Sequence, residues 1–189
     1  VTFTNPDNLT INSGQTVSLT LAQLTAFEAG GTVTNNGTLN VTTASGDLSS
    51  DNLSVVDGTL TLSGATTLPD STSDMPTAIN AASQAITVAA SADLTGVTFT
   101  NPDNLTINSG QTVSMTAAQV TAFNAGGTLT NNGTLNVSAT SDLSAQDLGG
   151  VTTLTLTGAA TLPDSTSDMP TAINAASQAI TVAASADLT

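Results

Sequence analysis

The strongest constraint on the fold of this chain is a tandem repeat. The first 18 residues, VTFTNPDNLTINSGQTVS, recur without change from Val97, which sets a period of 96 residues. The stretch LPDSTSDMPTAINAASQAITVAASADLT from Leu68 recurs from Leu162, two residues early because the second copy is shorter. Repetition on this scale is typical of arrays in which each unit packs on the unit before it. We therefore expect two copies of one module, residues 1–96 and 97–189, that belong to a longer array.

A shorter pattern recurs inside the module, in which apolar and small polar residues alternate. Runs of this kind begin at Val17, Leu39, Leu60, Ile86 and Val113, with spacings of 22, 21, 26 and 27 residues. Alternation with a period of two is the pattern of a β-strand that buries one face. Recurrence of one strand motif at this spacing favours coils that stack their strands one above another.

We therefore predict an all-β fold, a parallel β-solenoid (β-helix) of about eight coils, four in each module, and roughly 40 Å long. A second interpretation stays open. Asn36-Gly37 and Asp57-Gly58 stand between alternating runs, and such pairs are the strongest short-range signal for a β-hairpin. The alternative fold is therefore a series of antiparallel β-sandwich repeats.

Two stretches depart from the strand pattern and predict short helical corners. They are LTLAQLTAFEAGG, from Leu19, and SDMPTAINAASQ, from Ser73. Thr20 and Ser73 are suitable N-caps, Pro76 suits a first helical turn and Gly30 suits a helix end. We expect one turn of helix at each corner.

The core must be built almost without aromatic residues, because Phe3, Phe27, Phe99 and Phe123 are the only ones. We expect the phenylalanines to fill the wider corners. The alternating runs predict inward-facing columns made of Val17, Leu19, Leu39, Val41, Leu60, Leu62, Ile86 and Val88.

Both ends of a solenoid expose unpaired backbone and the apolar residues of the last coil. Val1 and Phe3 would lie at one end of this chain, and Val182 and Leu188 near the other. We therefore expect self-association, end to end, through neighbouring repeats.

The charge of the chain excludes several classes of function. It has 14 acidic residues and no Lys, Arg, His, Cys, Trp or Tyr, which gives a net charge of −14. Nucleic acids and acidic lipid surfaces are bound mainly by basic residues, so we expect neither as a partner. No apolar run is long enough for direct membrane insertion. Without the usual bases, nucleophiles and soft metal ligands, the chain is predicted not to be an enzyme.

The chain resembles the repeat segments of very long bacterial cell-surface and secreted proteins, the adhesin-like or fibre-forming β-solenoid kind. The tandem opening sequence carries this resemblance, together with the pair TLAQLTAFEAGGTVTNNGTLNV and TAAQVTAFNAGGTLTNNGTLNV and the lack of Lys and Arg. The resemblance implies an extracellular or cell-surface stalk, fibre or surface layer, and it supplies no catalytic residue.

Carboxylates are the only ionisable side chains, and they suggest a metal site. The sequence LPDSTSDMP holds Asp70 and Asp74 in the first copy and Asp164 and Asp168 in the second. Oxygen ligands of this kind suit Ca²⁺. The competing interpretation is that these aspartates are solvated turn residues that keep the protein soluble. We expect no other cofactor.

Two functions follow from these observations. The first is a structural one, the shaft of an extracellular fibre, stalk or surface layer. The second is a multivalent adhesin module that binds carbohydrate or a partner surface, with avidity that grows with the number of copies. Carbohydrate binding lacks direct support, because the chain offers few aromatic platforms for a sugar.

Overall fold

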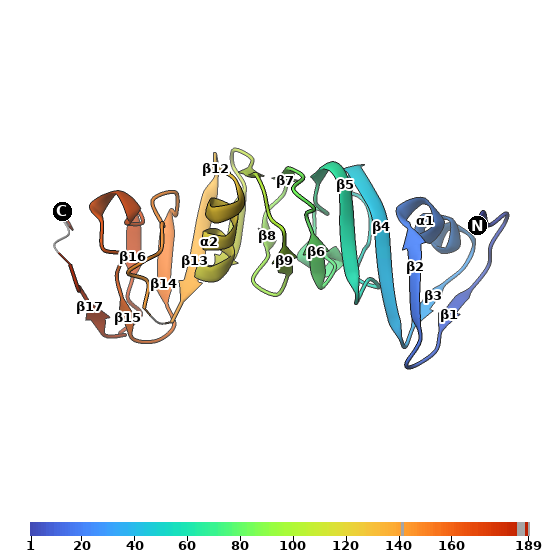
Figure 1. The fold of residues 1–189 in the computed structure, drawn as a ribbon, viewed down its shortest axis with the longest axis horizontal. Coiled ribbons are helices and arrows are strands. Elements are labelled where there is room, and N and C mark those ends of the chain that lie inside the picture. The colour runs from blue at the N-terminus through green and yellow to red at the C-terminus, as the bar shows by residue number, and fades with distance from the viewer. Residues whose placement is uncertain (141, 185–187, 189) are drawn as a thin grey trace.

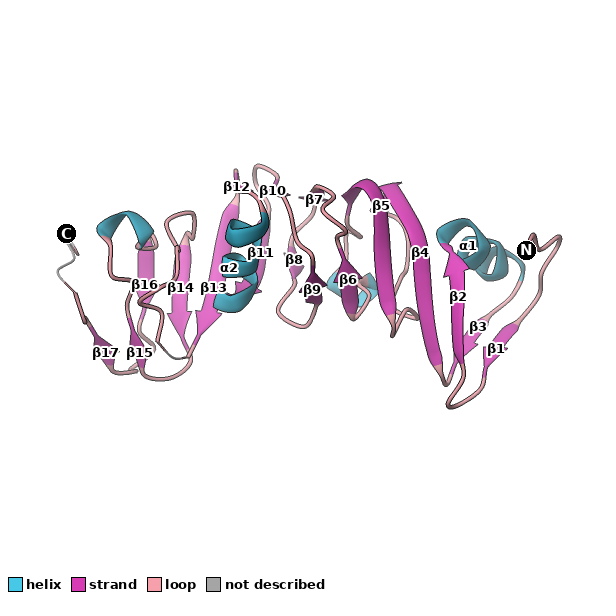
Figure 2. Cartoon of the chain, viewed as in Figure 1, coloured by secondary structure: helices cyan, strands magenta, loops and turns pink. Residues whose placement is uncertain are grey.

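The computed structural model describes residues 1–140, 142–184 and 188. Over these residues the chain is built mainly of short β-strands, with two α-helices and two 3₁₀ turns. The elements follow one another along the long axis of the molecule, so that the N-terminus and the C-terminus lie at opposite ends (Figures 1 and 2).

The first module contains β1 (Leu9–Ile11), β2 (Thr16–Thr20), α1 (Leu21–Gly30), β3 (Val33–Asn35), β4 (Thr38–Asp47), β5 (Thr59–Thr67), the 3₁₀ turn η1 (Thr72–Asp74), β6 (Ala78–Asn80), β7 (Ile86–Val88) and β8 (Ala92–Asp93). The second contains β9 (Thr98–Thr100), β10 (Leu105–Ile107), β11 (Thr112–Thr116), α2 (Ala117–Gly126), β12 (Leu129–Asn131), β13 (Thr134–Ala139), β14 (Thr153–Leu156), β15 (Ala160–Thr161), the 3₁₀ turn η2 (Thr166–Asp168), β16 (Ala172–Asn174) and β17 (Ile180–Thr181).

Every strand pairing made by the described residues is parallel. β2 pairs with β4 over five residues, with Val17 opposite Leu39, and the copy β11 pairs with β13 over five residues in the same way. The expectation of a β-rich chain is confirmed, and the sheets are parallel. Among the described residues, no sheet closes on itself. The antiparallel alternative is wrong for the part of the chain that the structure describes.

The Asn36-Gly37 pair shows why a turn signal did not produce a hairpin. The amide N–H of Asn36 donates to the carbonyl oxygen of Ile11 (2.9 Å), and the N–H of Thr38 donates to the carbonyl oxygen of Gln15 (2.8 Å). The residues on either side of the turn therefore bond to an earlier layer of the chain instead of to each other.

One predicted stack of strands is wrong. We expected Ile86 to stand above Leu60, but Leu60 pairs with Ile79 of β6. Ile86 pairs instead with Thr66, near the end of β5, and with Leu105 of β10. The pairing of β5 with β6 was missed because β6 lies in the stretch that the sequence analysis assigned to a helical corner.

Copies of the same strand lie in different sheets. β2 and β11 differ by one residue in sequence, yet β2 belongs to an eight-stranded sheet and β11 to a five-stranded sheet. The eight-stranded sheet instead contains β10, which is the copy of β1. The sequence of the module repeats, but a strand and its copy do not occupy the same sheet.

The first predicted corner is confirmed, and it is longer than one turn. Thr20 is the N-cap of α1, and its hydroxyl accepts from the amide of Gln23 while the Gln23 side chain bonds back to the amide of Thr20. This reciprocal arrangement satisfies two of the free donors at a helix start. The helix runs ten residues to Gly30, and Gly31 is the C-cap.

The second predicted corner is wrong. Ser71, and not Ser73, caps a single 3₁₀ turn, Thr72–Asp74. Met75, next to Pro76, is extended, as a residue before proline prefers to be. The residues after Pro76 then form β6 instead of a helix.

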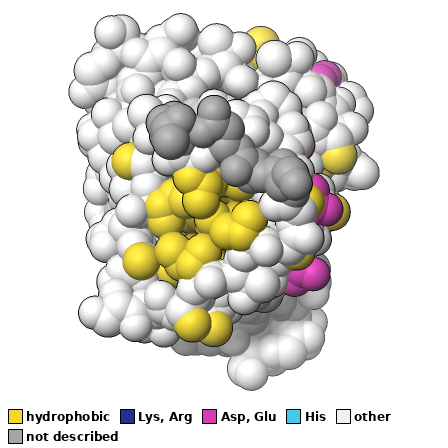
Figure 3. Space-filling model, turned by 90° about the vertical axis from the view of Figure 1, so that its left-hand side faces the viewer, with side chains coloured by type: hydrophobic (Ala, Val, Ile, Leu, Met, Phe, Trp, Pro, Cys, Tyr) yellow, Lys and Arg dark blue, Asp and Glu magenta, His cyan; other side chains and the backbone are white. Residues whose placement is uncertain are grey.

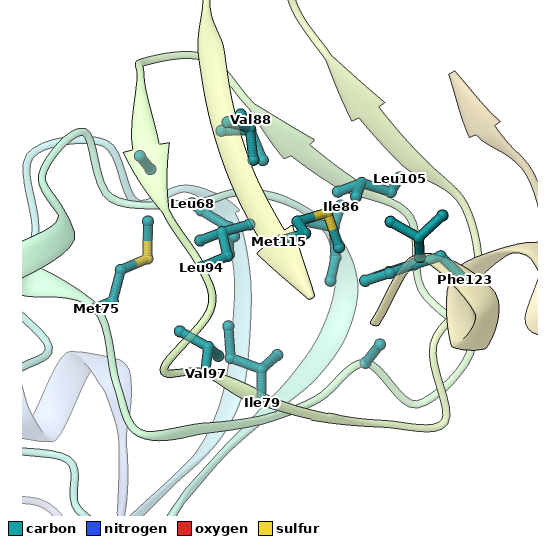
Figure 4. Close-up of a cluster of buried hydrophobic side chains, with 14 of the residues drawn as sticks. Leu68, Met75, Ile79, Ile86, Val88, Leu94, Val97, Leu105, Met115 and Phe123 are labelled. Atoms are coloured by element: carbon teal, nitrogen blue, oxygen red, sulfur yellow. The ribbon is translucent and has the colours of Figure 1, made fainter. Parts of the chain in front are cut away.

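The predicted inward-facing residues form the core. Seven of the eight are 5% exposed or less, and Val17 is partly buried. Phe27 and Phe123 are also buried, whereas Phe3 is 40% exposed. The buried side chains make one cluster that continues through both modules, and Figure 4 shows the part of it around the boundary between them.

Candidate functional site: the ends of the apolar core

The four aspartates of the predicted metal site lie in two loops, one in each module. Asp70 precedes Ser71, the N-cap of η1, and Asp74 is the last residue of η1. The Asp70 N–H donates to the Ser49 carbonyl oxygen (3.0 Å). The hydroxyl of Ser73 lies 3.4 Å from Asp74 Oδ1.

The second loop repeats the first. Asp164 N–H donates to the carbonyl oxygen of Ser144 (3.1 Å), and Ser167 Oγ donates to Asp168 Oδ1 (3.0 Å). Among the described residues no group of three acidic side chains gathers closely enough to hold a metal ion. Calcium binding at these loops stays a prediction.

A different group of acids lies close together beside α1. Burial raises the pKa of Glu28, and the neighbouring carboxylate of Asp51 raises it further. Burial likewise raises the pKa of Asp51, with a further contribution from Asp47. Asp47 itself has a lowered pKa because the backbone and side chain of Ser49 bond to its carboxylate. Sequence spacing could not reveal the proximity of Glu28 to Asp51, because it depends on how the helix packs.

The second module replaces part of this acidic group by amides. Asn124 stands where the first copy has Glu28, and its side-chain N–H donates to the carbonyl oxygen of Asp147 (3.1 Å). Gln146 stands in the place of Asp51 and bonds to the hydroxyl of Thr121. The repulsion between like charges is therefore not a requirement of the fold.

The C-terminal end of the core is open. Figure 3 looks at this end and shows apolar side chains gathered at its centre. They surround a hollow of about 450 Å³, which is lined by Leu162, Thr166, Met169, Pro170, Thr171, Ala172, Ile173, Ile180 and Leu188. An apolar surface of this kind commonly marks a place where another molecule binds.

The repeat supplies an internal control for this exposure. Ile180 is 42% exposed and Val182 is 45% exposed, whereas their identical counterparts Ile86 and Val88 are each 1% exposed. Leu188 is 59% exposed, and its counterpart Leu94 is fully buried. The local sequence is the same, so the difference comes from the second module, which covers the first copy.

The N-terminal end shows the same effect. Val1 is fully exposed, whereas its counterpart Val97 is 6% exposed. Thr98–Thr100 form strand β9 on β6, but the same three residues at the start of the first module form no strand. The predicted exposure of Val1, Phe3, Val182 and Leu188 is confirmed. The sequence analysis did not single out Ile180, although its copy Ile86 was expected to face inward.

Comparisons of the chain with protein families, with curated proteins and with solved structures found no match. Among the helices of the described residues, none combines the length and the apolar character that a membrane span requires.

Proposed function

We propose that the chain is a segment of a parallel β-solenoid, and that it serves without catalysis as the shaft of an extracellular fibre, stalk or surface layer. One observation carries this proposal. At the boundary between the modules β6 pairs with β9, β7 with β10 and β8 with β11, all in parallel. This is the same kind of pairing that joins strands within each module, so the boundary is a continuation of the stack.

The packing at the boundary supports the same conclusion. Ile79, Leu94 and Leu105 are fully buried there, and Ile86 and Val88 are 1% exposed. Each such side chain contributes about 1.5–3 kcal/mol when it is removed from water. Successive modules are therefore held by a shared core, and a tandem array of them forms one continuous rod instead of separate beads.

In the proposed solenoid each coil has three faces, numbered in the order in which the chain passes through them, and the strand pairing supports one face for each strand. The second face holds β2, the first parts of β4 and β5, then β6 and β9. The third face holds the later parts of β4 and β5, then β7, β10 and β12. The chain passes from β7 through β8 to β9, so β8 and its partners β11, β13, β14 and β16 belong to the first face.

In the proposed solenoid, this placement of the strands gives the number of coils that one module makes. β1 and β3 pair with each other, and each is followed in the chain by a strand of the second face, β2 and β4, so we place both on the first face of the proposed coil. The copy of β1, β10, then lies on the third face four coils later. One module therefore makes about four and two-thirds coils, in place of the four expected from the strand signatures, and the chain makes about nine. At about 4.8 Å per coil, each module adds about 22 Å to the shaft.

The composition supports an exposed location for such a shaft. The chain has no Lys or Arg, so proteases of the trypsin type find no cleavage site in it. Its 14 acidic residues keep a long array soluble through mutual repulsion.

Chains of two, four and six modules test the shaft directly. We expect rods in electron micrographs whose length grows linearly, by about 45 Å for each added pair of modules. Flexible strings of beads, or particles that do not lengthen, would contradict the proposal. A glycan array probed with the two-module chain tests the adhesin alternative, because a shaft alone should bind none of the sugars.

A further inference from the structure

We propose that the C-terminal end of one chain binds the N-terminal end of a second copy, and that this joint reproduces the boundary between the two modules. The inference rests on the proposed solenoid and adds a joint between separate chains. In this joint β17 would pair in parallel with β1, and β16 would pair with Thr2–Thr4.

The boundary between the two modules indicates that the molecule bound at the open C-terminal end is a second copy of the chain. The surface formed by Ile79, Ile86 and Val88 is covered by β9 and β10 of the second module. The same surface is open at Ile173, Ile180 and Val182. The first 18 residues of a second copy are identical to the first 18 of the segment that covers it within the chain.

The N-terminal end already has the shape that the joint requires. The rings of Phe3 and Phe27 lie 4.8 Å apart between centroids, close to the 5.1 Å between Phe99 and Phe123 at the boundary. β1 pairs with β3 in the same register as β10 pairs with β12. Binding would therefore cost little rearrangement, which favours association.

The packing of the helix against this end is also the same in both copies. The backbone of Gly30 lies so close to the carbonyl group of Pro6 that a side chain would collide with it, and Gly126 stands in the same relation to Pro102. The start of each module is thus held against its helix in one conformation.

Hydrogen bonds at the boundary identify further contacts. The side-chain N–H groups of Gln119 donate to the carbonyl oxygens of Leu94 (2.6 Å) and Val97 (2.7 Å). Its counterpart Gln23 donates to the carbonyl oxygen of Val1 (2.6 Å). In the joint, the Leu188 carbonyl of the neighbouring copy takes the place of Leu94 as the second acceptor.

A pair of asparagines repeats this relation. Asn101 Nδ2 donates to Asn80 Oδ1 (3.0 Å) across the boundary. The counterparts are Asn174 at the end of one copy, which corresponds to Asn80, and Asn5 at the start of the next, which corresponds to Asn101. Asn174 Oδ1 already accepts from the amide of Ala176 (3.2 Å), as Asn80 Oδ1 accepts from that of Ala82, so it is oriented to accept from Asn5.

The register of the joint follows from the register at the boundary. Thr87 stands opposite Thr106 there, so Thr181 of one copy should stand opposite Thr10 of the next. Both residues are exposed, and strands in a sheet lie about 4.8 Å apart, within the range that a disulfide spans. The chain has no cysteine, so any disulfide that forms must join the two introduced cysteines.

The first test mixes chains carrying Thr10→Cys with chains carrying Thr181→Cys under mild oxidation. We expect a disulfide-linked dimer that contains one of each chain as the main product. Thr34→Cys is the matched control, because Thr34 is also exposed but lies one strand further inside, opposite Thr10. Equal linking of Thr34→Cys and Thr10→Cys chains to Thr181→Cys would overturn the proposed register. A positive control is the single chain carrying both Thr87→Cys and Thr106→Cys, which stand opposite each other at the boundary. Its intrachain disulfide would show that this pairing geometry permits the bond.

The second test blocks one end at a time. Phe3→Asp and Ile180→Asp each place a charge on an apolar residue of one end, 40% and 42% exposed respectively. Phe3→Asp also removes the ring contact with Phe27, so a melting curve of each variant must show that it still folds. Each variant alone should be monomeric in analytical ultracentrifugation, and a mixture should form dimers with one chain of each. Dimers of either variant alone would show a different joint.

The outcomes separate this joint from the proposed shaft. If the parent chain stays monomeric at high protein concentration while tandem chains still lengthen with each module, the joint is wrong and the shaft stands. If tandem chains do not lengthen, the shaft is wrong, whatever the association state of the two-module chain.

Discussion

Single residues show how the fold tolerates a shortened repeat. In the first module the carboxylate of Asp57 accepts from the backbone N–H of Leu39 (2.9 Å) and from the side chain of Asn35 (2.6 Å). In the second module the hydroxyl of Thr152 accepts from the corresponding groups of Leu135 (3.0 Å) and Asn131 (3.3 Å). A different side chain satisfies the same donors, so the loss of residues in this loop leaves the next strand in register.

Gly37 tests how closely the layers of the chain approach one another. A side chain at this position would collide with the backbone carbonyl oxygens of Gln15 and Asn12. These oxygens already accept hydrogen bonds from the N–H groups of Thr38 (2.8 Å) and Gln15 (3.1 Å), so moving them would weaken those bonds. We expect Gly37→Ala to destabilise the protein by about 1–3 kcal/mol, measured by urea unfolding. Gly96→Ala is the control, because open space surrounds Gly96, and it should be neutral or stabilise by up to about 1 kcal/mol. Equal effects of the two changes would show that close packing is not the cause.

The acids beside α1 predict a pH-dependent stability. Glu28 and Asp51 have raised pKa values in the folded protein, so the folded state binds protons more tightly than the unfolded state. The contribution of these two acids to stability is therefore fully present below their ordinary pKa values, about 4, and it is lost as the pH rises through the folded values. Replacing them with the residues of the second module, as Glu28→Asn and Asp51→Gln, should raise the melting temperature at pH 7.

This gain should shrink as the pH is lowered to about 4, because the parent acids are then protonated and no longer repel each other. The exposed Asp7 provides the control, and Asp7→Asn removes one charge without touching this group. A similar gain from Asp7→Asn would assign the effect to the net charge of the whole chain.

The calcium prediction also concerns single residues. A site with a dissociation constant near 10⁻⁴ M would add about 2–3 kcal/mol of stability at 10 mM Ca²⁺. Melting curves at constant ionic strength in calcium, magnesium and chelator should therefore differ for the parent. They should converge for Asp70→Asn/Asp164→Asn. An undiminished calcium response in that double variant would leave these aspartates as solvated turn residues.

At the scale of elements, the sequence predicts what depends on local pattern. Alternation identified the buried residues of β2, β4 and β5, and a threonine before an apolar run identified the start of α1. It did not predict β6, because a three-residue strand carries too little alternation to be recognised. The turn after β6 places Ala82 and Ser83 at φ of 50° and 59°, a conformation that those residue types rarely adopt, so no local signal marks it.

The candidate site was predictable only in part for the same reason. The apolar residues of the two ends could be listed from the sequence, but the position of Ile180 in its sheet depends on the pairing of β15 with β17. Which strands pair over long distances is decided by the whole stack, and the spacing of similar runs is a poor guide to it.

The cap of α1 gives a prediction at this scale. Thr20→Ala removes the hydroxyl that accepts from Gln23 and should cost about 1 kcal/mol. Thr25→Ala makes the same change on the exposed side of the helix, where alanine is the better helix former and should be neutral or slightly stabilising. If the two variants unfold at the same urea concentration, the cap does not contribute.

At the scale of the whole molecule, the proposed advance of four and two-thirds coils distributes each module over all three faces. In that arrangement α1, between β2 and β3, would occupy the third face of its coil, and its copy α2, between β11 and β12, would occupy the second face. Three modules are needed before a feature returns to its original face. A long array would therefore carry its helices and its charges evenly around the axis, and no single side would be favoured for bending or for lateral contact.

The rotation can be measured in the two-module chain. Ser13 lies in the turn between β1 and β2, and its copy Ser109 lies between β10 and β11, which is a different corner of the proposed coil. Thr95, between β8 and β9, lies on the same corner of the proposed coil as Ser13. Along the axis, Thr95 is only slightly nearer to Ser13 than Ser109 is. With spin labels on introduced cysteines, we expect the distance between positions 13 and 109 to exceed that between 13 and 95 by much more than the axial difference, which is about 3 Å. All three residues are exposed, so the labels should not disturb the core. A difference of only about 3 Å would place both copies of the turn on one corner, and the module would then make a whole number of coils.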